Sequence, residues 1–243
     1  MHNDSKLPGI VDVTGPHDMP AGAFSTWLRR TRSARLNDSG ADVPCGECTA
    51  CCTSAYFIHI APEEIETLAR IPQQLLFPAP GQPKGNVLMG YDKNGHCPML
   101  TNNRCSIYEH RPQTCRTYDC RIFPAAGIAV SEPEKALIAQ RAAQWKFEYP
   151  TQRDRNEHAA VRAAAKFLHE RRECFPNGIP KHSTQLAVLA IEVYEVFLEL
   201  HANAAASAGT PTDLEIADAV IEAKRTLEAK RHPSQTPIDD RLG

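Results

Sequence analysis

The sequence lacks any hydrophobic run long enough to cross a membrane. No stretch of 18 apolar residues occurs among its 243 positions. Near the first residues no apolar run follows a basic one, and Asp4, Asp12 and Asp18 are unlike an acid-poor transit peptide. The sequence therefore predicts a cytoplasmic protein with no membrane partner.

The sequence also lacks a large excess of positive or negative charge, internal repeats and the common catalytic motifs. Lys and Arg number 27 against 29 Asp and Glu, for a net charge of -2, and 42% of residues are hydrophobic. This composition is typical of a folded globular chain of one or two domains. No repeat of about 20 to 50 residues occurs. A Walker loop, a His-Glu-x-x-His pair and a Ser-His-Asp order are all absent, so no motif assigns a reaction or a catalytic residue.

Cysteine is present at an ordinary overall level but is concentrated in one region. Eight of the nine cysteines lie between Cys45 and Cys120, and Cys174 stands alone. In the cytosol thiols stay reduced, so dense cysteines there more often hold metal than form disulfides. Metal binding is the favoured interpretation, and disulfide pairing is the alternative. Cys174 is expected to be a packed or surface thiol.

The spacing of the eight cysteines predicts two metal centres. Zn²⁺ and four-iron clusters each commonly take four thiolates, and a Cys-x2-Cys pair lets two sulfurs converge on one ion. Eight ligands therefore fit two four-cysteine centres, with zinc or iron, including a 4Fe-4S cluster, as cofactor. The predicted ligands are Cys45, Cys48, Cys51, Cys52, Cys97, Cys105, Cys115 and Cys120.

Neighbouring side chains restrict how these ligands divide. Cys51 and Cys52 are adjacent and tend to point apart, which favours different centres. Keeping Cys45 with Cys48 then leaves eight arrangements, and all of them join the first cysteine group to the later one. A single polynuclear cluster, or a centre with one open position, would break this count. His59, His96 and His110 lie in the same region and are alternative ligands.

Four arginines accompany the later cysteines. They are Arg104, Arg111, Arg116 and Arg121, with only Glu109 and Asp119 as acids in the same stretch. A four-thiolate centre carries a net charge of about -2, so nearby guanidinium groups would be stabilised. Exposed arginines on a helix are the simpler alternative.

The chain is expected to be mainly α, with a small irregular α+β domain that contains a β-hairpin and is stapled by metal. Four segments are predicted: an N-terminal extension at 1–44, partly disordered with a short basic helix at 23–36; a cysteine-cluster domain at 45–124; a helical region at 125–231 packed on it; and a flexible tail at 232–243. The basic helix carries Arg29, Arg30, Arg32 and Arg35, but its few aromatics do not favour nucleic-acid binding. A protein partner on the helical region is the interaction we expect.

Local patterns predict the individual elements. A strand is expected at 56–60, a helix opening at Pro62, a loop at 77–85, and a hairpin pairing 87–91 with 96–100 around an Asn-Gly turn. A helix is predicted from Ser131, with Ile138, Ala142, Trp145 and Tyr149 on one face. Further helices are predicted at 154–173, after Ser183, and after a cap formed by Thr212 and Glu215. The helix after Ser183 is apolar on two faces, so it is either central or covered by another chain.

The cysteine region resembles the YkgJ-type cysteine-cluster family, described as a zinc- or iron-chelating domain with a CxxCxxCC motif. The matching segments are Cys45-Gly46-Glu47-Cys48-Thr49-Ala50-Cys51-Cys52, Cys97-Pro98-Met99-Leu100, Cys105-Ser106-Ile107-Tyr108-Glu109-His110-Arg111-Pro112, Cys115-Arg116 and Cys120. The resemblance covers about residues 45 to 123. It implies metal chelation by these eight cysteines, with zinc and iron both open.

The resemblance also leaves two function classes to compare. In the first, the protein is a metal-binding module whose cellular role is undefined. In the second, it is an iron-sulfur-dependent oxidoreductase or a protein-modifying enzyme similar to the flagellin lysine methylases, which carry a similar cluster. No glycine-rich loop of the kind common for S-adenosylmethionine follows a strand. The first class is therefore favoured.

Overall fold

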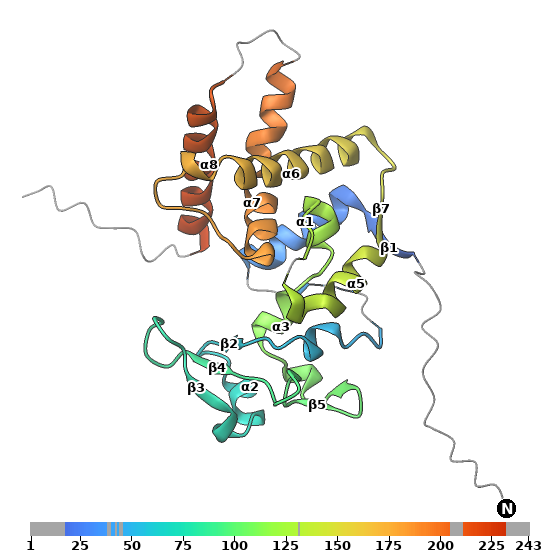
Figure 1. Ribbon diagram of the computed structural model, residues 1–243, viewed down its shortest axis with the longest axis vertical. Helices are drawn as coiled ribbons and strands as arrows, with labels where there is room; N and C mark the ends of the chain where they lie inside the picture. Colours follow the sequence, from blue (N-terminus) through green and yellow to red (C-terminus); the bar gives the residue numbers. More distant parts are fainter. Residues whose placement is uncertain are drawn as a thin grey trace, which may run out of the picture.

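The computed structural model describes residues 18–37, 40–41, 43, 46–130, 132–204 and 211–231. The described chain is mainly helical with a few small sheets, as the sequence predicts (Figure 1). The helices are α1 Phe24–Leu36, α2 Ile65–Arg70, α3 Gln113–Thr117, α4 Ile122–Ala126, α5 Ala136–Gln144, α6 Gln152–Glu170, α7 Ser183–Ala204 and α8 Asp213–Arg231. The strands are β1 Met19–Ala23, β2 Ile58–Ile60, β3 Leu76–Pro78, β4 Val87–Met89, β5 Leu100–Thr101, β6 Arg104–Cys105 and β7 Trp145–Glu148. Short 3₁₀ turns occur at Ala50–Thr53, Gln73–Leu75, Tyr108–His110, Pro133–Lys135 and Arg172–Cys174.

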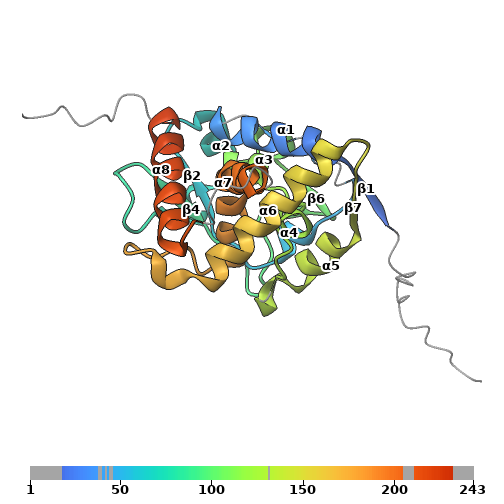
Figure 2. The ribbon, with the colours of Figure 1, turned by 90° about the horizontal axis from the view of Figure 1, so that it is seen from above.

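Helix α7 is the centre of the larger hydrophobic core. Figure 2 shows it between α1, α6 and α8, and α4 also packs against it. Ala187, Ala190 and Ile191 are fully buried, and Tyr194 is only 5% exposed. Both apolar faces of this helix are therefore covered by other helices of the same chain, which answers the question left open by its sequence. A protein partner on the helical region stays a prediction.

Helix α1, from the N-terminal part of the chain, packs against the helical region. Strand β1, just before it, pairs in parallel with β7, and Phe24 and Trp27 are buried in the large core. Two of its four arginines form ion pairs with α7: Arg32 with Glu195 at 2.6 Å and Arg35 with Glu192 at 3.1 Å. Half of the positive charge of this helix is thus neutralised within the chain.

The cysteine region has its own smaller core. Strands β2, β4 and β3 form an antiparallel sheet in that order. The buried residues of the smaller core are Ile60, Ile71, Met89, Met99 and Ile107. The large core begins again at Cys120 and includes Ile122 and Phe123 of α4. The chain therefore passes from the smaller core to the larger one between Ile107 and Cys120. The domain boundaries predicted from the sequence stay predictions.

Three predicted elements of the cysteine region were wrong in detail. Strand β4 pairs with β2 and β3 rather than with residues 96–100, because the turn at 92–95 leads straight to Cys97. The hairpin is instead β5 and β6, a few residues later. The expected loop at 77–85 begins with strand β3, which starts at Leu76. Helix α2 begins at Ile65, after a turn that contains Pro62.

The helical region follows its predicted pattern except around Trp145. Helix α5 ends at Gln144, and Trp145 starts strand β7, so Trp145 and Tyr149 do not continue the face of Ile138. Pairing with β1 supplies the hydrogen bonds that a longer helix would have supplied. Thr212 and Glu215 cap α8 as predicted. Ser131, residues 1–17 and the tail at 232–243 lie outside the described residues.

Among the described residues, no helix has the length and apolar character that membrane crossing requires. The cytoplasmic location stays a prediction.

Substitution of Ile191 by Ala should destabilise the protein strongly. Ile191 is 0% exposed at the centre of α7, so the change removes buried methyl groups and leaves a cavity. We expect a loss of about 2 to 5 kcal/mol of unfolding free energy in urea titrations. Leu214→Ala, at a side chain that is 65% exposed, should cost less than about 0.5 kcal/mol. Equal losses in the two variants would contradict the central position of α7.

Acid should weaken the fold partly through Asp154. This buried carboxylate accepts hydrogen bonds from the Ser25 and Thr151 N–H groups, and the Thr151 side chain and these amides lower its pKa from 3.8 to about 2. A depressed carboxylate pKa adds stability above pH 3.8 that is lost as the pH falls towards 2. Unfolding free energy measured from pH 5 to pH 2 should fall less steeply in Asp154→Asn than in the natural protein. An unchanged slope would show that Asp154 takes no part.

Candidate metal centre

Cys52 and Cys97 lie side by side although they are far apart in the sequence. The Cys97 N–H donates to the Cys52 carbonyl oxygen at 2.7 Å, and the Ala55 N–H donates to the Gly95 carbonyl oxygen at 2.8 Å. Gly95 has φ +80°, and a Cβ there would lie 3.3 Å from Ala55 Cβ. A side chain at position 95 would therefore strain this crossing of the two segments. The first cysteine group thus meets the later one at this point.

A tight hairpin places Cys105 near Cys97. Asn102 and Asn103 connect β5 to β6 with φ of 51° and 58°, which matches the left-handed pair of a type I′ turn. Leu100 pairs with Cys105 across the hairpin, and the Leu100 N–H donates to the Cys97 carbonyl oxygen at 2.9 Å. Cys97 and Cys105 both pack against the smaller core. The turn therefore brings Cys97 and Cys105, which are separated by seven residues in the sequence, onto one small core.

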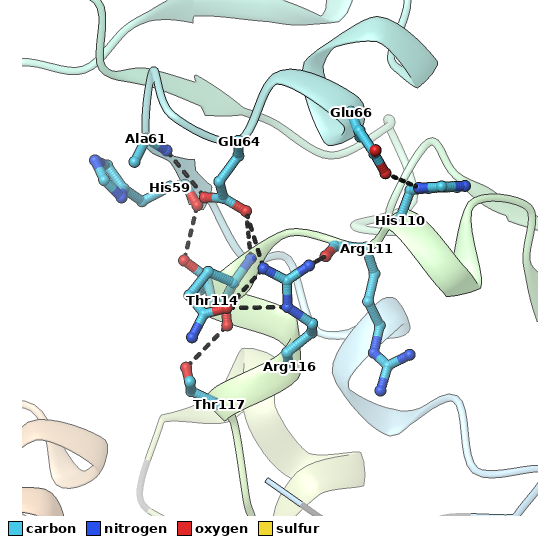
Figure 3. A network of polar contacts seen from close by, with 10 residues as sticks. His59, Ala61, Glu64, Glu66, His110, Arg111, Thr114, Arg116 and Thr117 are labelled. Atoms are coloured by element: carbon cyan, nitrogen blue, oxygen red, sulfur yellow. Dashed lines mark hydrogen bonds and ion pairs between the residues drawn. The ribbon is translucent and has the colours of Figure 1, made fainter. Parts of the chain in front are cut away.

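A polar network holds the helix that carries Cys115 (Figure 3). The Thr114 hydroxyl donates to the His59 carbonyl oxygen at 2.7 Å, which ties α3 to β2. The Glu64 carboxylate accepts from the Gln113 N–H at 2.6 Å and from the Ala61 N–H at 3.0 Å. The same carboxylate lies 3.8 Å from a guanidinium nitrogen of Arg116. Glu64 thus joins the starts of α2 and α3.

Cys115 lies within electrostatic reach of three other cysteines. Burial is the largest cause that raises its pKa to about 12, and the charges of Cys97, Cys52 and Cys105 contribute to the rise in that order. Only the Arg111 guanidinium acts in the opposite direction among the causes that shift it. The sulfurs of Cys52, Cys97 and Cys105 therefore each lie within electrostatic reach of Cys115.

Cys51 and Cys120 belong to a second neighbourhood around Tyr118. The Tyr118 hydroxyl oxygen is buried, and no described residue pairs with it at normal hydrogen-bond distance. Burial raises the Tyr118 pKa, and the charges of Cys51, Tyr56 and, more weakly, Cys120 add to the rise. Cys120 also accepts a hydrogen bond from the Trp145 indole, with Nε1 and Sγ 3.1 Å apart. Adjacent residues Cys51 and Cys52 thus face different cysteine neighbours.

The remaining predicted ligands are less defined. Cys45 lies outside the described residues, and Cys48 is half-buried. No disulfide joins cysteines within the described part of the chain. In the same part, no three Cys, His, Asp or Glu side chains already have the spacing of a bound metal. The fold therefore gathers the cysteines, while their ligation of metal stays a prediction.

Two of the alternative histidine ligands contact other partners. His59 Nε2 lies 2.9 Å from Asn86 Oδ1, and His110 Nδ1 lies 3.1 Å from Glu66 Oε2. Figure 3 shows His110 directed towards Glu66. His96 makes its contact through the backbone: its N–H donates to Asp92 Oδ1 at 2.9 Å. These contacts favour the cysteines as the donors.

The four arginines near the later cysteines have separate roles. Arg111 lies over the Tyr108 ring at 4.0 Å and lowers the pKa of Cys115. Arg116 donates to Gln113 Oε1 and to the Arg111 carbonyl oxygen. Arg121 is buried against Asp119 at 2.9 Å, and Arg104 is exposed on β6. One arginine of the four therefore acts directly on the cysteine charges.

The comparison with protein families agrees with this arrangement. Residues 44–145 match the CxxCxxCC family, described as a putative zinc- or iron-chelating domain. This segment is therefore similar to a metal-chelating domain. Comparison with curated proteins and with solved structures gives no match. The match extends through α5 to Trp145, further than the stretch from 45 to 123 that carries the quoted motifs.

Three residues that support the cysteines were missed in the sequence. Glu64, Tyr118 and Trp145 have no motif around them, and their roles depend on contacts between distant segments. The rarity of tryptophan is the one available signal, because the chain has only two. The wrong helix predicted through Trp145 concealed its position beside Cys120.

Loss of the Glu64 carboxylate should destabilise the cysteine region. Its side chain is 11% exposed and accepts two backbone hydrogen bonds, so Glu64→Ala removes the acceptor of two part-buried N–H groups. We expect about 1 to 3 kcal/mol less unfolding free energy in urea. Glu66→Ala, at a side chain 83% exposed, should cost about 0 to 1 kcal/mol. Comparable effects would mean that the Glu64 network does not support α3.

Proposed function

We propose that this protein binds zinc or iron through eight cysteines arranged in two centres. The first centre consists of Cys52, Cys97, Cys105 and Cys115. The second consists of Cys45, Cys48, Cys51 and Cys120. This division is one of the eight arrangements that the spacing allows, and it keeps Cys51 and Cys52 in different centres. Catalysis is not part of the proposal.

The gathering of three cysteines around Cys115 carries this proposal. They come from the 3₁₀ turn at Ala50–Thr53, the segment before β5, and β6, and Cys115 itself comes from α3. Two of these cysteines are held in place by polar or turn contacts, Cys115 through the Glu64 network and Cys105 through the β5–β6 turn. Four sulfurs form the donor set that Zn²⁺ and iron-sulfur clusters prefer.

The electrostatics of the first centre also favour a cation. A largely buried thiol whose pKa is raised by burial and by neighbouring cysteines stays protonated at neutral pH unless positive charge is placed beside it. The Arg111 guanidinium supplies too little, because the Cys115 pKa stays raised to about 12. A bound metal ion would supply that charge and keep the sulfurs as thiolates. The residues present therefore fit such a group.

The second centre is supported by Cys51 and Cys120. Both lie near the buried Tyr118 hydroxyl. A thiolate sulfur could accept a hydrogen bond from this hydroxyl. Cys45 and Cys48 complete the set because the first centre uses the other four cysteines, and the Cys-x2-Cys spacing suits one ion.

Metal analysis of cysteine variants tests the division. The full chain, purified without oxygen, should carry two centres, and Cys115→Ser and Cys120→Ser should each lose one. The double variant should lose both, because each substitution removes a ligand from a different set. Elemental analysis after dialysis against a weak chelator measures the stoichiometry, and brown colour that bleaches on reduction identifies iron-sulfur clusters.

Cys174→Ser is the matched control and should keep full metal content, since Cys174 lies outside the cysteine region. Metal-free natural protein would refute the proposed function. Full metal content in the double variant would do the same. Loss of all metal in either single variant, with the fold retained, would indicate one shared cluster instead of two centres.

A further inference from the structure

Trp145 contacts Cys120 through the only polar atom of its side chain. The indole Nε1 donates to Cys120 Sγ at 3.1 Å, and the two residues are 2% and 6% exposed. An indole N–H is a donor only, so the sulfur must accept. Trp145 starts β7, whose pairing with β1 fixes the backbone from which the ring extends. The contact is therefore buried and held from the helical side of the molecule.

Positive charge lies on the faces of the same indole. The Arg141 and Arg121 guanidinium carbons are 5.3 and 5.7 Å from the Trp145 ring centroid. Cations over an aromatic ring are attracted to its negative face and draw electron density from it. This arrangement strengthens the N–H as a donor to a negative sulfur. The charge of Arg121 is itself held by Asp119, at 2.9 Å.

The other tryptophan provides a natural comparison. Trp27 is also buried, and its Nε1 donates to Asp119 Oδ2 at 2.8 Å, one residue before Cys120. The two tryptophans therefore hold the same short segment, but only Trp145 donates to the sulfur. A structural effect on this segment should follow from loss of either, whereas an electronic effect on Cys120 should follow from loss of Trp145 alone.

We propose that Trp145 is a positioning residue for the second metal centre, where its N–H stabilises the Cys120 thiolate and raises the affinity of that centre for metal. This inference rests on the proposed function. Hydrogen bonds from charged or polarised donors to a thiolate lower its energy, and groups that support a ligand in this way typically change metal affinity 10- to 100-fold. The first centre, around Cys115, should not depend on Trp145.

Cobalt(II) titration of the full metal-free chain tests the inference. Thiolate-bound Co²⁺ absorbs in the ultraviolet and visible ranges, so a competing chelator gives the affinity of each equivalent. Trp145→Phe should bind one equivalent about 10- to 100-fold more weakly, with a shifted sulfur-to-cobalt band, and bind the other unchanged. Trp27→Phe should leave the band position and the affinity of the first centre as in the natural protein.

An isosteric side chain separates the hydrogen bond from packing. Benzothienylalanine at position 145 keeps the size of tryptophan but replaces the indole N–H with sulfur. It should reproduce the weakened equivalent and the shifted band of Trp145→Phe, without that variant's loss of packing. Natural-like affinities with benzothienylalanine would overturn the inference. Equal weakening of both equivalents would overturn it as well.

The outcomes also distinguish the inference from the proposed function. If the natural protein binds fewer than two equivalents of Co²⁺ through sulfur, the two-centre proposal fails. If it binds two and the Trp145 variants do not differ from it, only the role of Trp145 is refuted.

Discussion

The mutual repulsion of closely placed sulfurs is the constraint on which the cysteine region depends. Cys115 lies within electrostatic reach of Cys52, Cys97 and Cys105, and burial together with their charges raises its pKa to about 12. As uncharged thiols without a metal, these side chains stabilise the fold no more than packed hydrophobic side chains would. The same groups become strongly stabilising when a cation lies among them, since binding energy then adds to folding energy. This accounts for a small core supported by so many polar contacts.

The two cysteine neighbourhoods differ in what surrounds them. The first lies in the part of the chain with the smaller core and is held by backbone contacts, the β5–β6 turn and the Glu64 network. The second lies where the larger core begins, beside Cys120 and Trp145. Metal in the second neighbourhood would therefore link the cysteine region to the helices, whereas metal in the first would stabilise the cysteine region itself.

The sequence was sufficient for the mixed α+β class, the long helices and the CxxCxxCC domain. Helices α6, α7 and α8 follow from apolar periodicity and caps, which are local signals. The strand errors have a shared cause: β4 and β7 are set by pairing with segments distant in sequence, and local patterns do not identify a partner. The Asn-Gly at 94–95 forms a turn but no hairpin, while Asn102-Asn103 forms the hairpin.

The division of the cysteines also depended on the structure. Spacing leaves eight arrangements, and contacts around Cys115 and Tyr118 favour one of them. An anomalous difference map, recorded at the zinc or iron edge from crystals of the full chain, tests this division most directly. Our account predicts two separate peaks, one among Cys52, Cys97, Cys105 and Cys115 and one beside Cys51 and Cys120. No peak, or one peak shared by all these cysteines, would contradict it.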